Sequence, residues 1–561
     1  MKQYDVVVIG SGASGGAVAH TLTKAGYKVA VVEKGRLIKR EEFTKDELAY
    51  CRRDIVTPNL FEEYHVIEEK VDGKWEGTPT YDSGWSFWNG NVVGGSSNFM
   101  SGMLHRMHPD DFRLKSKYGA IKGANVVDWP ISYDEMEPYY LKAEELVGIS
   151  GKYEKHPYEP PRSTADFTQP PTQENAVVKL LDKSCAELNI KSLVTPRSVL
   201  SQNKGHRKAC YYSNFCGSYG CSSGAKGSSR EALLMPALAS GNLTLLSNTY
   251  VKSLHTSKKE AVDYAVVVDV LTGKEKQLYA DLFVVAAQAH ESARLLLNSA
   301  SEFHPNGLAN SSGELGKNLI FSAGGSGQGE LHADKLKEIR FEELMQTGLF
   351  VNRSILDWYF IDHWWDGTFK GGSVEFMFEH QNIISRARKN SEENGQLVWG
   401  KALGEKLTER FTKQKSIRFE IFNDWLPNDN CFVSLDKTHK DKYGMPVGRL
   451  RVEAHPQDLK VGKYIAEKCE KVLEEMGAQN IYSSVSSSPP QNLIAGGCRF
   501  GDDPKTSVLN RYCQAHDVPN LFVADASFMP TGGSVPYTWT IYANAFRVAD
   551  HIVKVLKEKQ I

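Results

Sequence analysis

The chain has 561 residues, 41% of them hydrophobic, and can bury a larger core than one domain usually holds. Its 67 basic and 68 acidic side chains nearly cancel, which argues against a nucleic acid or an anionic membrane as partner. We therefore expect two structural domains and a small, neutral substrate or partner.

The opening residues, "MKQYDVVVIG", predict neither a secretion signal nor an anchor, because they carry one basic side chain and no apolar segment of sufficient length. No later run of about 20 apolar residues could form a membrane span. The 9 cysteines are odd in number and scattered, unlike a secreted disulfide framework. Taken alone, the missing signal favours the cytoplasm.

The N-terminal segment predicts a strand, a turn, a helix and a second strand. Residues 4–9, "YDVVVI", are apolar, an Ala-rich amphipathic stretch runs to about Lys24, and "KVAVVE" is a second apolar run. Gly10, Gly12 and Gly15 have G-x-G-x-x-G spacing. The first two glycines permit a tight turn and close approach of a pyrophosphate, and the third lets helix and strand pack closely.

Glu33 ends the second predicted strand, where a carboxylate would accept hydrogen bonds from both ribose hydroxyls. Strand, helix, strand and terminal acid in register predict a dinucleotide-binding site. We expect Ala13 to be one of the residues that contact the dinucleotide. Its position at the N-terminus favours FAD.

The rest of the chain mixes strand and helix patterns without internal repeats. Periodicity predicts strands in 243–285 and 415–455, helices in 286–300 and 456–477, and a final strand, glycine turn and helix. The stretch 75–112 looks like ordered, functional loop, and 150–175 like a crossing linker.

The segment "CYYSNFCGSYGC" concentrates three cysteines, Cys210, Cys216 and Cys221, in 12 residues. Thiolates are soft ligands that suit iron, and one loop can enclose a cluster. Three cysteines alone also fit a zinc site that lacks one ligand, or a disulfide with a spare thiol.

Several blocks give the chain a resemblance to the glucose-methanol-choline (GMC) flavoprotein oxidoreductases. They are the N-terminal glycine motif, "VVGGSSNFMSGMLHRMHPDDF" at 92–112, "AAQAHESARLLLNSA" at 286–300 and the block at 496–530. With "DWPISYDEMEPYY" at 128–140 and the cysteine segment, the chain resembles in particular the large subunits of gluconate 2-dehydrogenase, fructose dehydrogenase and FAD-dependent glucose dehydrogenase.

The resemblance implies an α/β fold: a Rossmann-like FAD-binding domain and an α+β substrate domain built on an antiparallel sheet. The FAD domain would comprise 1–125, 205–335 and 485–561, with an iron-sulfur loop at 207–228, and the substrate domain 126–204 and 336–484. Further FAD-binding residues implied by the family are Gly94, Gly95, Ser96, Ser97, Asn98, Asp525, Ala526 and Thr538.

In the similar large subunits, three cysteines hold a [3Fe-4S] cluster, and the resemblance assigns Cys210, Cys216 and Cys221 this role. Such a cluster would pass electrons one at a time from the flavin to a cytochrome or quinone acceptor, which favours a dehydrogenase over an oxidase. A small subunit that bears an export signal is also implied. Co-export with it would place the chain in the periplasm or at the membrane.

The sequence departs from the family at the usual proton acceptor. The family's catalytic His position holds Leu493, and that of its Asn or His partner holds Pro536, and neither side chain can accept a proton. Alternative catalytic candidates are Gln491 and Asn492 by a register shift, His363 and His380 in an aromatic segment, and Tyr537 as a hydrogen-bonding neighbour.

Three functions stay open. The first is FAD-dependent oxidation of a C–OH group in a sugar, glycoside or polyol. The second is a flavin and iron-sulfur enzyme that desaturates or reduces a non-sugar metabolite, which the missing histidine would permit. The third is a catalytically silent electron-transfer subunit.

Overall fold

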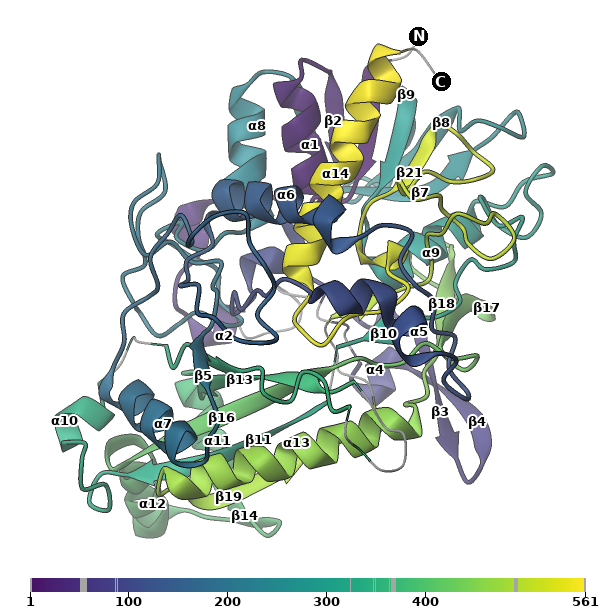
Figure 1. Cartoon of the computed structure of the whole chain (residues 1–561). Coiled ribbons are helices and arrows are strands. Elements are labelled where there is room, and N and C mark those ends of the chain that lie inside the picture. Colours follow the sequence, from purple (N-terminus) through teal and green to yellow (C-terminus); the bar gives the residue numbers. More distant parts are fainter. Residues whose placement is uncertain are drawn as a thin grey trace.

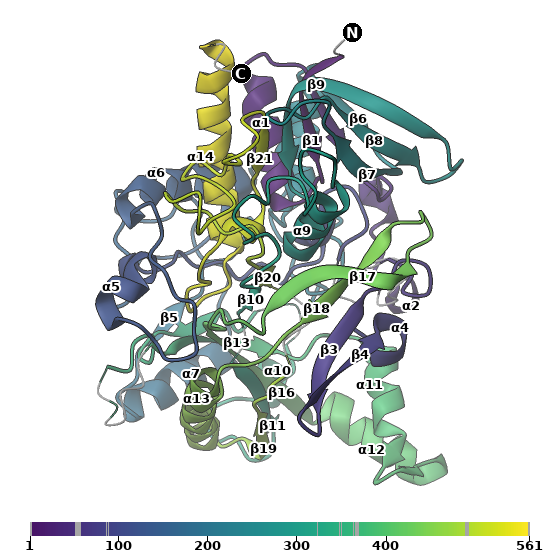
Figure 2. The same cartoon turned by 90° about the vertical axis from the view of Figure 1, so that its right-hand side faces the viewer.

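A computed structural model describes residues 3–50, 58–85, 87, 89–322, 324–346, 348, 350–362, 364, 370–488 and 493–558. Two sheets with their helices form two parts, one above the other in Figure 1. A third, four-stranded sheet lies along one flank (Figure 2).

The upper part is a seven-stranded, mainly parallel sheet of order β6-β2-β1-β9-β8-β7, with β21 paired to β9. Its strands are β1 (Tyr4–Ile9), β2 (Val29–Val32), β6 (Leu243–Leu246), β7 (Thr249–His255), β8 (Tyr264–Asp269), β9 (Glu275–Val285) and β21 (Leu521–Val523). The predicted β1-turn-helix-β2 unit is present, and Val7 pairs with Ala30 and Phe283.

Helices bury the Val-rich strands of this sheet, as parallel sheets require. The helices that contact its strands include α1 (Ala13–Lys24), α8 (Met235–Ala239) and α9 (Ala289–Asn298), and the upper part also contains α6 (Tyr133–Ala143) and α14 (Thr538–Lys557). The first helix packs on the last, and α14 packs on α6 (Figure 1). The two ends of the chain therefore build one core.

The lower part is a six-stranded antiparallel sheet of order β19-β11-β16-β13-β12-β5. Its strands are β5 (Ser192–Val194), β11 (Gly325–His332), β12 (Arg353–Ile355), β13 (Gly372–Phe378), β16 (Gln414–Asn423) and β19 (Gln479–Ser484). Ile417, Phe419 and Ile421 of β16 belong to a buried apolar cluster with Val461 and Ile465 of α13 (Pro456–Glu475). The alternate residues of β16 consequently face the opposite side of the sheet, toward the upper part.

The flanking sheet joins distant stretches of chain in the order β17-β18-β3-β4. It contains β3 (Val66–Val71), β4 (Lys74–Pro79), β17 (Phe432–Lys440) and β18 (Pro446–Arg451). The short strands are β10 (Ile320–Phe321), β14 (Glu392–Glu393), β15 (Gln396–Leu397) and β20 (Ile494–Ala495). The other helices are α2 (Glu47–Tyr50), α4 (Thr80–Ser83), α5 (Leu114–Tyr118), α7 (Ala176–Glu187), α10 (Phe341–Leu344), α11 (Ile383–Asn390) and α12 (Gly400–Thr412).

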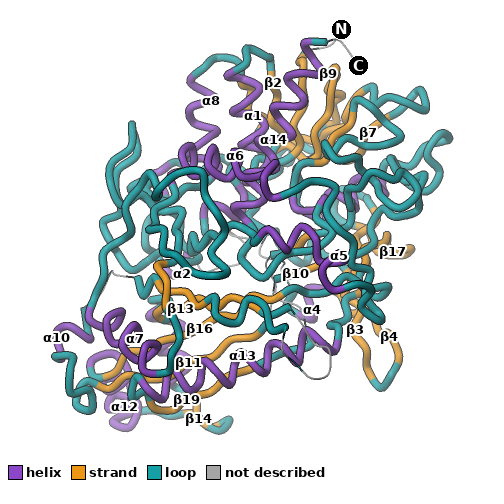
Figure 3. The backbone as a smooth tube through the Cα atoms, viewed as in Figure 1, coloured by secondary structure: helices purple, strands orange, loops and turns teal. Residues whose placement is uncertain are grey.

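The predicted linker, residues 150–175, runs as loop between α6 and α7 (Figure 3). Strand β11 lies within the stretch assigned to the FAD domain but pairs in the six-stranded sheet. The exact domain boundaries stay a prediction. Among the helices of the described residues, none combines the length and apolar character that a bilayer crossing requires.

A buried cluster of charges joins the two parts beside the glycine turn of the tail. The Lys370 Nζ atom lies 2.7 Å from Asp111 Oδ1 and 3.7 Å from Asp424 Oδ2, and donates to Ser534 Oγ at 2.7 Å. The Tyr359 hydroxyl also donates to Asp111. Burial raises the pKa of Asp424 to about 6, although Lys370 opposes the shift.

Replacing Lys370 with Met should destabilise the protein by about 3–5 kcal/mol, because two buried carboxylates would lose their cation. The shift of the urea midpoint measures this effect. Lys401→Met is the matched control, since Lys401 pairs with Glu405 on the surface and should change the midpoint little. Equal midpoints for the two variants would contradict the role given to Lys370.

Candidate functional site

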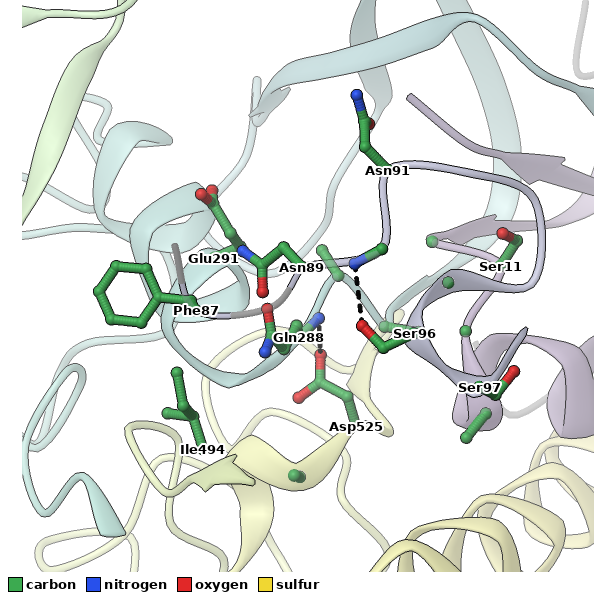
Figure 4. Close-up of a pocket in the computed structure, with 18 of the residues that line it drawn as sticks. Ser11, Phe87, Asn89, Asn91, Ser96, Ser97, Gln288, Glu291, Ile494 and Asp525 are labelled. Carbon is green, nitrogen blue, oxygen red and sulfur yellow. Dashed lines mark hydrogen bonds between the residues drawn. The ribbon is translucent and has the colours of Figure 1, made fainter. Parts of the chain in front are cut away.

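A cavity of about 680 Å³ lies between the N-terminal glycine turn and the six-stranded sheet. Figure 4 shows one section of its wall, to which Ser11, Ser96, Gln288 and Asp525 come from separate segments and where the Gln288 amide donates to Asp525. The upper and the lower part of the molecule both line the cavity, so a group bound there would contact both parts.

The three motif glycines each have a distinct steric reason. Gly10 has φ +101°, and a Cβ there would lie 2.2 Å from the Ala286 carbonyl oxygen. A Cβ on Gly15 would lie 2.0 Å from the Gly10 oxygen, so the strand and helix touch at this point. At Gly12 a Cβ would meet no atom within 4 Å, and this residue faces the cavity. Its missing side chain leaves room for a ligand.

Glu33 lies at the end of β2 in the cavity wall. One carboxylate oxygen accepts from the Ser11 amide at 3.1 Å and the Ser11 hydroxyl at 2.5 Å, and the other accepts from the Gly35 amide at 2.8 Å. Burial raises the pKa of Glu33, although these donors oppose the shift. The carboxylate is thus fixed at the edge of the space beside the glycine turn.

The predicted flavin loop divides into lining and supporting residues. Gly95, Ser96 and Ser97 line the cavity. Asn98 supports the turn from behind, since its amide donates to the Val93 carbonyl at 2.9 Å and to the Gly95 carbonyl at 3.0 Å. Gly94, with φ +94°, donates its amide to Ser11 Oγ at 2.8 Å and so joins this loop to the glycine turn.

The tail contributes Asp525, Ala526 and Thr538 to the cavity wall. Asp525 is held by the Gln288 amide at 3.1 Å, by the Ser527 amide at 2.9 Å and by the Ser292 hydroxyl. Thr538 is the first residue of α14, and Ala13 in the same wall is the first residue of α1. Two helix N-termini therefore face the cavity, where their partial positive charge favours an anionic ligand.

Leu493 and Pro536, the two positions where the resemblance predicts the family's catalytic pair, carry apolar side chains. Leu493 lines the cavity. Tyr537 also lines it, but its hydroxyl donates to the Leu493 carbonyl, and burial raises its pKa well above the usual range. The candidates Gln491, Asn492 and His363 lie outside the described residues.

His380, two residues after β13, lines the cavity at the sheet side. Burial, followed by the charges of Arg418, Lys226 and Arg197, lowers its pKa to about 4, so the ring is neutral at physiological pH. The sheet also presents Arg418 and Glu420, which the sequence analysis missed. Their signal is the alternation in "KSIRFEIFN", where they interrupt the apolar residues of β16.

The three cysteines of the 210–221 segment are free thiols that line one small cavity. The Tyr212 amide approaches Cys210 Sγ at 3.3 Å, and the Lys226 amide approaches Cys221 Sγ at 3.5 Å. Burial alone would raise the pKa of Cys221, but Lys226 and Ser223 lower it on balance. The donor set is therefore three thiols that line one small cavity together with the buried Lys226.

The thiol loop is joined directly to the flavin loop. The Lys226 ammonium donates to the carbonyls of Asn98 at 3.2 Å, Cys216 at 2.8 Å and Tyr219 at 2.9 Å. The Ser218 amide donates to the Phe99 carbonyl at 2.8 Å, and Ser218 lines the large cavity. The loop that carries the thiols is thus part of the wall of the large cavity.

Within the described part of the chain, one trio of metal-ligating atoms lies within 4.8 Å of one another: His65, His290 and Glu291. His65 Nδ1 accepts the Gly448 amide at 3.1 Å, so Nε2 carries the proton toward Glu291 at 2.9 Å. A protonated nitrogen has no lone pair for a metal. This trio is therefore explained as a hydrogen-bond network.

The family models for GMC oxidoreductase match residues 4–321 and 427–545. The chain belongs to the GMC oxidoreductase family. It is 29% identical to paromamine 6'-oxidase of Streptomyces fradiae, with 98% of this chain and 91% of that protein covered. It is 29% identical to 2-methyl-1,2-propanediol dehydrogenase of Mycolicibacterium austroafricanum (98% and 95% covered) and 26% identical to the fructose dehydrogenase large subunit of Gluconobacter japonicus (99% and 98% covered).

The fold also matches the solved structure of a formate oxidase from Aspergillus oryzae, with a TM-score of 0.62 at 14% identity over 100% of this chain and 99% of that one. The predicted family and α/β fold class of this GMC protein are confirmed. As a GMC oxidoreductase the chain is an FAD-dependent enzyme, and its relatives are named as oxidases and dehydrogenases of alcohol- or sugar-type compounds.

Proposed function

We propose that this GMC protein is a dehydrogenase that oxidises a C–OH group of a sugar, glycoside or polyol and releases the electrons through a [3Fe-4S] cluster. The observation that carries the proposal is the shared wall: Ser218 lies between Cys216 and Cys221 and also lines the cavity of the glycine turn. A cluster on this loop would be one short electron transfer away from a flavin in that cavity.

The described residues fit an FAD molecule. The open face of Gly12 and the N-termini of α1 and α14 suit phosphate and pyrimidine oxygens, and Glu33 suits a ribose. Gly95, Ser96, Ser97, Asp525, Ala526 and Thr538 would surround the rest of the flavin, with Gly94 and Asn98 as support. When bound, FAD supplies the acceptor for the hydride that leaves the substrate carbon.

The thiol loop fits a cluster better than a single metal ion. The three sulfurs do not form a trio within 4.8 Å among the ligand groups of the described chain. A lone zinc, with Zn–S distances of about 2.3 Å, would hold them at most about 4.6 Å apart. A cluster has a separate iron atom for each thiolate and tolerates the wider spacing. Lys226 and Arg197 would balance its negative charge.

The acceptor that this proposal requires is a one-electron partner, such as a cytochrome or a quinone, with a small subunit completing the assembly. The substrate cavity argues against a silent subunit, because charged groups on β16 face into it. The second function, on a non-sugar metabolite, is favoured only by Leu493 and Pro536 at the family's catalytic positions.

Anaerobic mixing with a panel of compounds tests the proposed function. D-Fructose, 2-methyl-1,2-propanediol, D-gluconate and paromamine supply neutral, anionic and cationic hydroxyl compounds. We expect a neutral polyhydroxyl compound to bleach the flavin absorbance, and cytochrome c to restore it. Bleaching by none of them, but by a metabolite without an oxidisable hydroxyl group, would overturn the proposal.

A further inference from the structure

We propose that Glu420 accepts the proton of the substrate hydroxyl and that Arg418 binds a neighbouring oxygen, so that the preferred substrate is an uncharged compound with two adjacent oxygens. This inference rests on the proposed function and names residues that take over the task of the missing histidine. It concerns a different pair of residues from those that the family motifs predict.

Both side chains come from the polar face of β16, in the middle of the lower sheet between β11 and β13 (Figure 1). Ile417, Phe419 and Ile421 occupy the apolar face, so Arg418 and Glu420 project to the other side, where they line the large cavity. Leu493 and Tyr537 line the same cavity. The pair thus shares a chamber with the positions where the family carries its proton acceptor.

Neither charge is used by the fold. Among the described residues, no side chain forms a hydrogen bond or ion pair with Arg418 or Glu420. The neighbouring Glu375, paired with Glu420 across the sheet, is different, since it bonds His105 Nε2 at 2.5 Å and Thr195 Oγ1 at 2.8 Å. Both side chains are half-buried at the cavity wall, and charged groups that are largely removed from water normally have partners. Two charged side chains without protein partners on a cavity wall therefore indicate that a ligand binds them.

The surrounding charges favour Glu420 over His380 as the proton acceptor. Proton uptake by His380 would place another cation among Arg418, Lys226 and Arg197, and burial already lowers the pKa of this ring to about 4. Proton uptake by Glu420 instead removes a half-buried negative charge that lies across the sheet from Glu375. Burial and Glu375 raise the pKa of Glu420, and Arg418 opposes the shift.

The bond changes balance with these residues. The carbinol C–H bond breaks, and its hydrogen leaves with both electrons to the oxidant that the enzyme family supplies. The O–H bond breaks, its proton goes to the Glu420 carboxylate, and the C–O bond becomes C=O. Glu420 later returns the proton to solvent, and Arg418 keeps its charge throughout.

The spacing of the pair selects the substrate class. Residues two apart on one strand face the same side about 6–7 Å apart at Cα, close enough for both side chains to reach one small molecule. A carboxylate and a guanidinium together suit two adjacent hydroxyl or carbonyl oxygens. An anionic sugar acid would be attracted by Arg418 but repelled by Glu420, and a cationic amino sugar the reverse, so a charged substrate pairs with one of the two groups only at the expense of the other. A neutral diol or sugar avoids both costs.

The decisive test compares Glu420→Gln with His380→Asn. Anaerobic rates of flavin bleaching are measured across pH with D-fructose or 2-methyl-1,2-propanediol, whichever reduces the wild type. Glu420→Gln should lower the rate by roughly 10²–10⁴-fold and remove the decline of the rate toward acid pH. His380→Asn should keep that decline. The reverse pattern would overturn the proposal.

A stability measurement provides a readout apart from turnover. Because the folded-state pKa of Glu420 lies above the usual 4.5, stability present at low pH is lost as pH rises through the folded-state pKa. The charged groups that face it are Glu375 of β13 and Arg418 of β16, the titratable His380 lines the same cavity with a neutral ring, and β11 presents the uncharged Ser326. Glu420→Gln should therefore melt at a higher temperature than wild type at neutral pH, with the difference vanishing in acid. A lower melting temperature would indicate a structural role.

Arg418→Met tests the substrate class. Its flavin-bleaching rates with D-fructose, D-gluconate and paromamine should show weaker use of the neutral compound and a shift toward cationic paromamine. An unchanged preference would contradict the role of Arg418. If none of the hydroxyl compounds bleaches the flavin of the wild type, the proposed function fails. If a compound bleaches both the wild type and Glu420→Gln at the same rate, only the role of Glu420 fails.

Discussion

Gly12→Val is expected to give a folded protein without flavin. Gly12 has φ −63°, which any residue can adopt, and a Cβ there meets no protein atom within 4 Å. The new methyl groups would therefore enter the cavity, where the proposed pyrophosphate approaches the backbone. We expect FAD affinity to fall by about 100-fold or more, equivalent to roughly 2.8 kcal/mol.

Flavin absorbance relative to protein absorbance, with the melting temperature, measures this effect. Gly404→Val is the matched control, because Gly404 in α12 has the same open surroundings but lies away from the cavity wall. It should keep both flavin and stability. A yellow Gly12→Val protein with normal flavin content would refute the assignment of the cavity.

Cys216→Ser should separate the two halves of the reaction. Loss of one thiolate should lower the affinity for the cluster by at least about 10–100-fold, since even changes around a ligand have effects of that size, and the iron content should fall with it. The flavin should remain bound and be bleached by substrate as in the wild type. Reduction of cytochrome c should be lost, because the route out of the cavity is broken.

Iron analysis and the rate of cytochrome c reduction by the substrate-reduced enzyme check this prediction. Cys431→Ser is the control, since its Sγ lies in the core and donates to the Glu453 carbonyl at 3.3 Å, which a serine hydroxyl can replace. That variant should behave as wild type. Normal cytochrome c reduction by an iron-free Cys216→Ser protein would remove the cluster from the electron path.

Local sequence patterns predicted the parts of the fold that depend on neighbours in the chain. The β1-α1-β2 unit was readable because apolar runs bracket Gly10, Gly12 and Gly15, and the structure gives each glycine a steric reason. The long helix α13 was readable from its amphipathic period. Strand β16 was readable from its alternation.

The part of the large cavity that lies against the six-stranded sheet was not predictable from these patterns. Which face of β16 meets the cavity depends on pairing with β11 and β13, about 90 and 45 residues away in the chain. The contact between Lys226 and the Asn98 carbonyl spans 128 residues and places the thiol loop at the cavity wall. Tyr537 was predicted as a hydrogen-bonding neighbour. That its hydroxyl donates to the Leu493 carbonyl could not be predicted, because this contact depends on the folded backbone.

The central claim is that electrons pass from a substrate hydroxyl carbon through a flavin to iron on the 210–221 loop. Electron paramagnetic resonance of the anaerobic protein, recorded before and after a bleaching substrate is added, tests it most directly. We expect an iron-sulfur signal in the oxidised protein that changes when substrate is added, with iron and flavin present in the ratio of one [3Fe-4S] cluster to one FAD. A flavin that substrate bleaches in a protein without iron, or a cluster signal that the same substrate leaves unchanged, would contradict it.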